Sequence, residues 1–262
     1  MNGSTPVLET RDVMIRFGGL TAVSNFNIAV PKGGIVGLIG PNGAGKTTCF
    51  NIITGFYKPT KGEVLLEGKP ITGLPPYKVC EAGIARTFQN IRLFYNETVL
   101  QNVMIGGFVR QKSHWWMPPL MLPSCTREEK ELRETAMALL ESLGLDKVAG
   151  ETSNSLPYGA QRRLEIARAL ATKPKFLLLD EPAAGMNPQE SQELMAFIKK
   201  IRADFDLTIL LIEHDMKVVM GVCEYIWVLD YGILIAEGNP EQIRSNPRVI
   251  EAYLGEEATQ NA

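Results

Sequence analysis

The fold is decided by the stretch Gly40-Pro41-Asn42-Gly43-Ala44-Gly45-Lys46-Thr47-Thr48. Its glycines let the backbone bend so that successive N–H groups turn inward toward an anion. The spacing Gly-x4-Gly-Lys-Thr is typical of a loop that holds nucleotide phosphates. In such a loop Lys46 reaches the β- and γ-phosphates and the Thr47 hydroxyl binds Mg²⁺. We expect Thr48 to contact the α-phosphate.

The residues on either side of this loop supply the structural context that it needs. Ile35–Ile39 is a short apolar run, as expected of a buried parallel strand, and a helical pattern begins at Lys46. The helix would add its positive end to the phosphate site. A strand, a glycine loop and a helix in this order argue against the alternative, a glycine turn followed by Lys-Thr through chance.

The rest of the chain alternates between predicted strands and helices. Strands are predicted at 7–17, 22–30, 62–71, 176–179 and 208–212. Residues 91–150 are predicted to be mostly helical, and a further helix spans 189–205. Two runs, 225–229 and 233–237, flank Asp230-Tyr231-Gly232 and predict a hairpin. This alternation favours an α/β fold.

Bulk composition excludes several classes of protein. The chain has 262 residues, 45% of them hydrophobic, and a formal net charge of −2, so no broad positive field points to nucleic acid. Its four cysteines lie far apart and predict reduced thiols in a cytosolic protein. We expect no signal peptide and no transmembrane segment, since no apolar run approaches the ~20 residues that a spanning helix needs.

A second half of the nucleotide site is predicted at the end of the strand that begins at Phe176. That apolar run ends in Asp180 and Glu181. Asp180 would bind the Mg²⁺ shell, and Glu181 would orient or deprotonate the attacking water. A glycine loop of this kind also serves GTPases and small-molecule kinases. The chain has no Asn-Lys-x-Asp motif, which argues against a Ras-like GTPase.

Between the two halves, the stretch 156–170 (Leu-Pro-Tyr-Gly-Ala-Gln-Arg-Arg-Leu-Glu-Ile-Ala-Arg-Ala-Leu) resembles the signature segment of ABC-transporter ATPases. Other landmarks of that family follow in the expected order. Phe17 resembles the aromatic residue that stacks on adenine, and Gln89 resembles the glutamine that senses the γ-phosphate and its Mg²⁺. His214 resembles the switch histidine on the γ-phosphate, and 184–187 matches the position of the D-loop.

The resemblance implies a P-loop NTPase (RecA-like) core with an antiparallel β subdomain and a helical subdomain. We assign residues 7–90 and 166–240 to the core with its β subdomain, and 91–165 to the helical subdomain. The helical subdomain would carry the signature, with Tyr158 and Gly159 facing nucleotide, and an insertion at 111–126. This Trp115-Trp116-containing insertion would cover the subdomain or contact a membrane subunit. Residues 241–262 would form a C-terminal helix and tail.

The insertion and the stretches 180–188, 212–220 and 246–255 are similar to those of the branched-chain amino acid uptake group, in the longer of its two ATPases. That similarity implies an ATPase subunit on the cytoplasmic face of the bacterial inner membrane. Its partners would be a second ATPase subunit, two permeases and, indirectly, a periplasmic solute-binding protein. Urea or short amides are alternative solutes. A soluble ABC ATPase and a module that binds ATP without hydrolysing it are alternative functions.

The chain departs from the family pattern at three positions. Pro157 replaces the signature serine, Ala160 replaces its last glutamine, and Asn187 stands where an aspartate is usual. Proline has neither a hydroxyl nor an N–H, although it suits the first turn of a helix at 158–170. We therefore expect this subunit to complete the weaker of two unequal ATP sites in a heterodimer.

Overall fold

The computed structural model describes residues 5–110 and 123–260, so the Trp115-Trp116 insertion lies outside the described residues. The chain forms two compact units: Met1–Arg86 with Lys175–Ala262, and Thr87–Pro174. These bounds differ from the expected boundaries at 90/91 and 165/166. The second boundary falls later because helix α5 (Tyr158–Ala171) continues without a break past residue 165.

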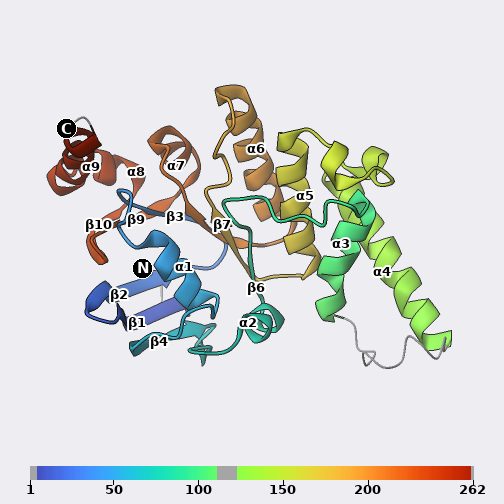
Figure 1. The fold of residues 1–262 in the computed structure, drawn as a ribbon, viewed down its shortest axis with the longest axis horizontal. Helices are drawn as coiled ribbons and strands as arrows, with labels where there is room; N and C mark the ends of the chain where they lie inside the picture. The colour runs from blue at the N-terminus through green and yellow to red at the C-terminus, as the bar shows by residue number, and fades with distance from the viewer. Residues whose placement is uncertain (1–4, 111–122, 261–262) are drawn as a thin grey trace. The chain divides into compact units, whose positions relative to one another are not determined.

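The first unit contains a six-stranded sheet that confirms the predicted α/β fold (Figure 1). Its strands run in the order β10-β9-β3-β8-β7-β6, with β10 antiparallel to β9 and the other neighbours parallel. Every residue of β3, β7 and β8 is buried, which explains their mostly apolar sequences. The bounds are β3 Ile35–Ile39, β6 Ile84–Arg86, β7 Phe176–Asp180, β8 Thr208–Ile212, β9 Tyr225–Asp230 and β10 Ile233–Gly238.

The same unit contains an antiparallel sheet of strands β1 (Leu8–Phe17), β2 (Leu20–Val30), β4 (Lys61–Leu66) and β5 (Lys69–Pro70), in the order β2-β1-β4-β5. The β2 strand begins two residues before the predicted start because Leu20 pairs with Phe17 across the turn. The predicted strand at 62–71 is two strands, since Glu67 and Gly68 have positive φ and turn the chain between them.

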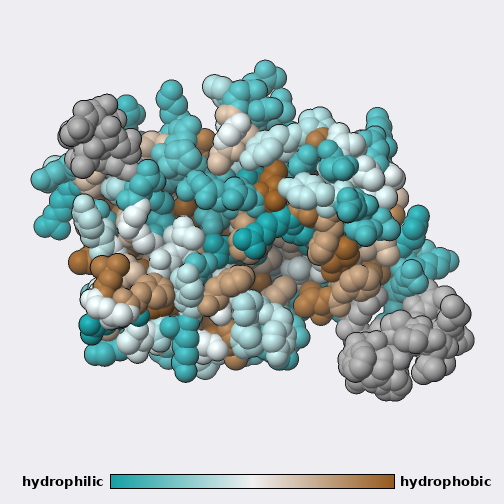
Figure 2. Space-filling model, in the orientation of Figure 1, coloured by the Kyte–Doolittle hydropathy of each residue, from teal (hydrophilic) through white to brown (hydrophobic). Residues whose placement is uncertain are grey.

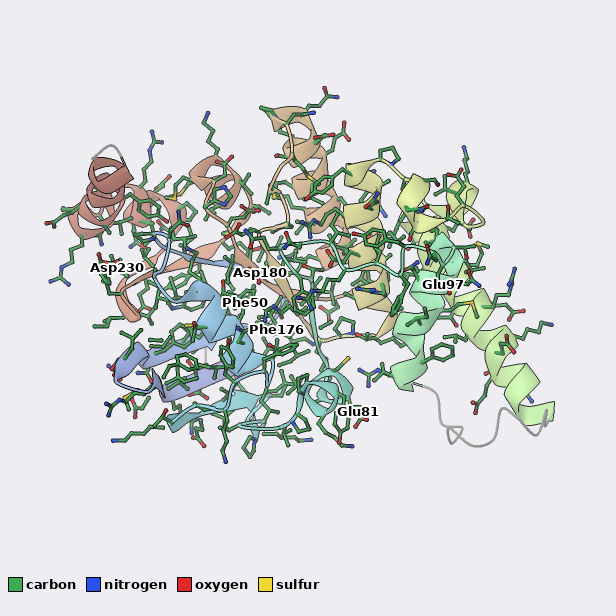
Figure 3. The ribbon with its side chains drawn as sticks, in the orientation of Figure 1. Phe50, Glu81, Glu97, Phe176, Asp180 and Asp230 are labelled. Atoms are coloured by element: carbon green, nitrogen blue, oxygen red, sulfur yellow. The ribbon has the colours of Figure 1, made fainter. Side chains whose placement is uncertain are left out.

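Helix α1 (Lys46–Ile53) lies between the two sheets (Figure 1). Its buried Phe50 packs in one hydrophobic core with Phe26 of β2, Leu38 of β3 and Phe176 of β7. Figure 3 shows Phe50 and Phe176 near one another in this layer. The remaining helices of the unit are α2 (Pro76–Ala82), α6 (Pro188–Asp204), α7 (Met216–Val222), α8 (Pro240–Arg244) and α9 (Pro247–Gln260).

The second unit is helical. Its helices are α3 (Val99–Gly107), α4 (Pro123–Ser142) and α5, with 3₁₀ turns at Phe108–Arg110, Asp146–Val148 and Ser153–Ser155. Helices α3 and α5 approach closely: a β-carbon on Gly106 would stand 2.3 Å from the carbonyl oxygen of Arg168. Helix α5 begins at Tyr158, as predicted. Among the described residues, no helix is both long and apolar enough to cross a bilayer.

Asn187 begins helix α6 as its N-cap. Its side-chain oxygen accepts a hydrogen bond from the Glu190 N–H at 3.0 Å, and the Glu190 carboxylate accepts one from the Asn187 N–H at 2.9 Å. We expect Asn187→Ala to lower the free energy of unfolding by about 1 kcal/mol, because it removes this capping box. Asn187→Asp keeps an acceptor and should unfold at the urea midpoint of the parent. Equal loss in both variants would contradict the capping role.

Candidate nucleotide-binding site

The backbone of the phosphate loop requires glycine at specific positions. Gly40 has φ 151°, and a β-carbon there would stand 1.9 Å from the Leu229 carbonyl oxygen. Gly45 is the N-cap of α1, with φ 102° and no side-chain hydrogen bond to the helix. The first turn of α1 contains no acidic residue. The positive end of α1 therefore carries neither a capping side chain nor an acidic residue of its own first turn, as suits an anion site.

Lys46 lies over this loop. Its side chain is only 7% exposed, and Nζ donates hydrogen bonds to the carbonyl oxygens of Gly40, at 2.7 Å, and Pro41, at 2.9 Å. Asn42 and Thr47 are exposed on the same loop and the first helical turn. The ammonium group and the helix end thus place positive charge at one point, where phosphate oxygens would be stabilised.

The turn between β9 and β10 supports the loop from the side. The Gly232 N–H donates to the Ala44 carbonyl at 2.9 Å, and the Ser24 N–H donates to the Gly232 carbonyl at 2.9 Å. A hollow of about 640 Å³ borders the loop here and is lined by Pro41–Ala44, Asp230, Tyr231, Ile235, Arg248, Glu251 and Ala252. Figure 3 labels Asp230 at this edge. A second hollow of about 1110 Å³, between α7, α8 and α9, contains none of the predicted site residues.

Asp180, Glu181 and His214 follow the ends of two neighbouring strands. Asp180 pairs in register with Ile212, so β7 and β8 end level with one another. The Glu181 N–H donates to the Ile212 carbonyl at 2.9 Å, and His214 Nδ1 lies 3.6 Å from Glu181 Oε2. The structure therefore brings together the predicted base and the predicted switch histidine. Glu181 has φ 45°, an unusual value for a residue other than glycine that often marks a functional site.

Glu213 organises the turn that carries His214, a role that no sequence pattern predicted. Its carboxylate is buried and accepts hydrogen bonds from the N–H groups of Ala183, at 2.8 Å, and His214, at 3.3 Å. Burial raises the pKa of Glu213, while the Ala183 N–H and the neighbouring His214 act against that shift. The carboxylate thereby ties the segment after Glu181 to the segment before His214.

Arg86 is a further residue that the sequence did not reveal. Its Nη2 donates to Asp180 Oδ2 at 2.6 Å, and its Nη1 donates to Asn51 Oδ1 at 2.7 Å. The side chains of Arg86 and Asp180 are each 6% exposed. The guanidinium lies 5.4 Å from the centre of the Phe50 ring, and Figure 3 shows Phe50 beside Asp180. Arg86 thus joins the end of β7 to α1, the helix that directly follows the phosphate loop.

Phe17 lies at the end of β1 and is 45% exposed. Its ring meets Tyr57 edge to face, with centroids 5.2 Å apart and planes at 73°. Figure 2 shows apolar surface where the β1–β2 and β9–β10 hairpins end, and Leu20 and Ile233 are exposed there. An exposed ring held at one edge by a second aromatic residue is suited to stacking on a flat base. Tyr57 was not predicted.

Gln89, Tyr158 and Gly159 belong to the second unit, so their geometry is described within it. The Gln89 side chain is exposed. The main-chain carbonyl of Gln89 accepts a hydrogen bond from Arg162 Nη2 at 2.7 Å. Pro157 is the N-cap of α5, where its carbonyl accepts from the N–H groups of Ala160 and Gln161. Proline is therefore compatible with this helix start, and no side chain caps it.

The residues of the first unit fit Mg²⁺-ATP. Glycine at position 40 lets the loop pack against the Leu229 carbonyl of β9, where any β-carbon would clash. Thr47 and Asp180 offer a hydroxyl and a carboxylate, the hard oxygen ligands that Mg²⁺ prefers. Lys46 and the end of α1 supply the charge that complements phosphate.

We expect Arg86→Met to lower the free energy of unfolding by about 3–5 kcal/mol, because it leaves the Asp180 carboxylate buried without its partner. Urea unfolding of the full chain measures this. Lys200→Met is the matched control, since it breaks the exposed Lys200–Asp204 pair on α6 and should leave the midpoint unchanged. Equal stability of the Arg86→Met variant and the parent would contradict a structural role for the buried pair.

Comparison with known proteins finds similarity along nearly the whole chain. Residues 23–184 match the family model described as ABC transporter, and residues 234–259 match that of the branched-chain amino acid ATP-binding cassette transporter. The chain is 49% identical over 253 residues to the high-affinity branched-chain amino acid transport ATP-binding protein LivG of Escherichia coli. It is 47% identical over 253 residues to BraF of Pseudomonas aeruginosa, a protein with the same description. Each alignment covers 97% of this chain and 99% of the relative.

Solved structures show the same similarity. The ADP conformation of an ATP-binding cassette of an ABC transporter matches with a TM-score of 0.84 and 34% identity, over 95% of this chain and 98% of that one. A nucleotide-free cassette matches with a TM-score of 0.82 and 33% identity, over 94% of this chain and 98% of that one.

Proposed function

This chain belongs to the ABC transporter family, and on that basis we propose that it is the ATP-hydrolysing subunit of an importer for branched-chain amino acids. The observation that supports ATP hydrolysis most directly is the placement of Glu181 beside His214, after the ends of β7 and β8, with β8 next to the strand that leads into the phosphate loop. The solute class is supported by the two relatives, whose names specify branched-chain amino acid transport.

The proposed chemistry is in-line attack of water on the γ-phosphate of ATP. Lys46 and the N–H groups of the loop stabilise the charge on the phosphate oxygens. Glu181 orients the water and accepts its proton, and His214 lies within reach of the same phosphate. Thr47 and Asp180 would hold Mg²⁺, which would offset negative charge on the phosphates. Phe17 would stack on the adenine ring.

The proposed partner is a second ATPase subunit, with each signature segment facing the phosphate loop of the other chain. Two permease subunits would connect this pair to the membrane, on its cytoplasmic face, and a periplasmic solute-binding protein would deliver the solute to them. The signature of this chain would contact the partner's ATP through the start of α5, at Tyr158 and Gly159. Because Pro157 supplies no hydroxyl, that composite site would be the weaker one.

We expect Glu181→Gln to bind ATP but to lower turnover by ~10²-fold or more in the purified complex, the scale of losing a general base. Glutamine keeps the shape of the side chain but cannot accept the proton. Glu193→Gln on α6, an exposed position of the same unit, should hydrolyse at the parent rate. Near-parental turnover of Glu181→Gln would refute the role of Glu181.

We also expect the double variant Pro157→Ser, Asn187→Asp to raise ATP turnover or nucleotide affinity in the assembled heterodimer. The serine restores a hydroxyl donor at the start of α5, and aspartate preserves the cap of α6. Steady-state ATPase measurements with the parental partner decide this. The hypothesis of unequal sites fails if neither the rate nor the affinity changes.

A further inference from the structure

One face of helix α5 carries charged side chains that are buried rather than solvated. Arg162 and Glu165 are three residues apart and therefore share a helix face. Arg162 is fully buried and Glu165 is 1% exposed. Burial of an ion pair costs desolvation free energy, so such a pair needs further hydrogen bonds to be tolerated. Its partners therefore indicate what it holds in place.

The partners are main-chain groups of the segment Phe88–Arg92, which includes Gln89. Arg162 donates from Nη1 to the Phe88 carbonyl and from Nη2 to the Gln89 carbonyl, each at 2.7 Å. It also donates from Nη1 to Glu165 Oε2 at 2.7 Å. Glu165 Oε1 accepts from the Arg92 N–H at 3.2 Å and the Phe88 N–H at 3.5 Å. The pair thus binds the backbone on both sides of Gln89.

The same segment is fixed beyond Arg92 as well. The Arg168 guanidinium lies 5.5 Å from the centre of the Phe94 ring. Asn102 of α3, which is fully buried, accepts from the Phe94 N–H at 2.9 Å and donates to the Phe94 carbonyl at 3.1 Å. The backbone around Gln89 is consequently anchored to two helices of its own unit, while the Gln89 side chain is exposed.

The first turn of α5 joins this arrangement to the signature. Arg162 Nη2 lies 3.3 Å from the hydroxyl of Tyr158, the first residue of the helix. A displacement of the start of α5 would therefore move Arg162 and, through its two carbonyl contacts, Gln89.

We propose that Arg162 and Glu165 are positioning residues that couple the signature end of α5 to Gln89. A displacement of the signature is thereby transmitted to Gln89, a residue of the proposed hydrolysis machinery. The proposal rests on the proposed ATPase function. Arg162 and Glu165 themselves touch no nucleotide and act through the backbone of Phe88–Arg92.

The test is a double-mutant cycle on ATP turnover in the assembled complex. The clamp variant Arg162→Met, Glu165→Leu removes both charges together, because such a replacement of a buried pair preserves folding better than removal of one partner. The matched control is Arg127→Met, Glu131→Leu, which removes an exposed ion pair of α4 in the same unit. Should the clamp variant not fold, Arg162→Lys keeps the charge but loses the planar fork that spans both carbonyls.

We expect the clamp variant to lower kcat by about tenfold or more, since displacing a catalytic group by about 1 Å can cost ~10²-fold. In a Gln89→Ala background the same change should have no further effect, because it acts only through Gln89. An equal loss in both backgrounds would assign the pair a merely structural role and overturn the proposal. Unchanged turnover of the clamp variant in the parental background would overturn it too.

Amide hydrogen exchange of the full chain, without nucleotide, tests the positioning step independently of catalysis. Protection of the N–H groups of residues 88 and 92 should fall in the clamp variant and stay at the parental level in the control. Unchanged protection would overturn the proposal even if the complex hydrolyses ATP. Absence of turnover in the parental complex, by contrast, would refute the proposed function. Hydrogen exchange would then still test whether Arg162 and Glu165 hold the backbone around Gln89 in place.

Discussion

Three parallel strands, β3, β7 and β8, are buried along their whole length, and their pairing sets where the candidate site residues of the first unit leave the sheet. Leu38 of β3 and Asp180 of β7 both pair with Ile212 of β8, so the three strands end in one row. A shift of one residue in either pairing would move one strand end out of this row. The phosphate loop, Glu181 and His214 leave the sheet at that row, although 174 positions separate Gly40 from His214 in the sequence.

Local patterns in the sequence were sufficient for the phosphate loop, its helix and the buried strands, because each depends on neighbours along the chain. Helix α5 begins at Tyr158, as its proline predicted, and β9 and β10 form the expected hairpin. The roles of Arg86 and Glu213 could not be predicted. A charged residue is usually solvated, and Arg86 meets Asp180 across 94 positions. Pairing of this kind depends on the assembled sheet.

Two buried arginines bracket the short segment that leads from β6 to Gln89. On one side Arg86 directs its own side chain to Asp180 within the first unit. On the other side, Arg162 donates hydrogen bonds to the main-chain carbonyls of Phe88 and Gln89 within the second unit. Each pair is costly to bury and costly to break. Each end of this segment is therefore attached within its own unit.

The hydrogen bond from Gly232 to Ala44 has a consequence for how the protein is made. Residues 40–48 leave the ribosome early, yet their lateral support, and the strands on both sides of β3, come from residues 208–232. During synthesis the glycine-rich loop emerges before the residues that support it, and the apolar β3 has neither of its neighbouring strands until β8 and β9 have been made. Such long-range pairing slows folding and exposes strand edges. Nucleotide capture by the nascent chain would accordingly begin only after most of the polypeptide has been translated.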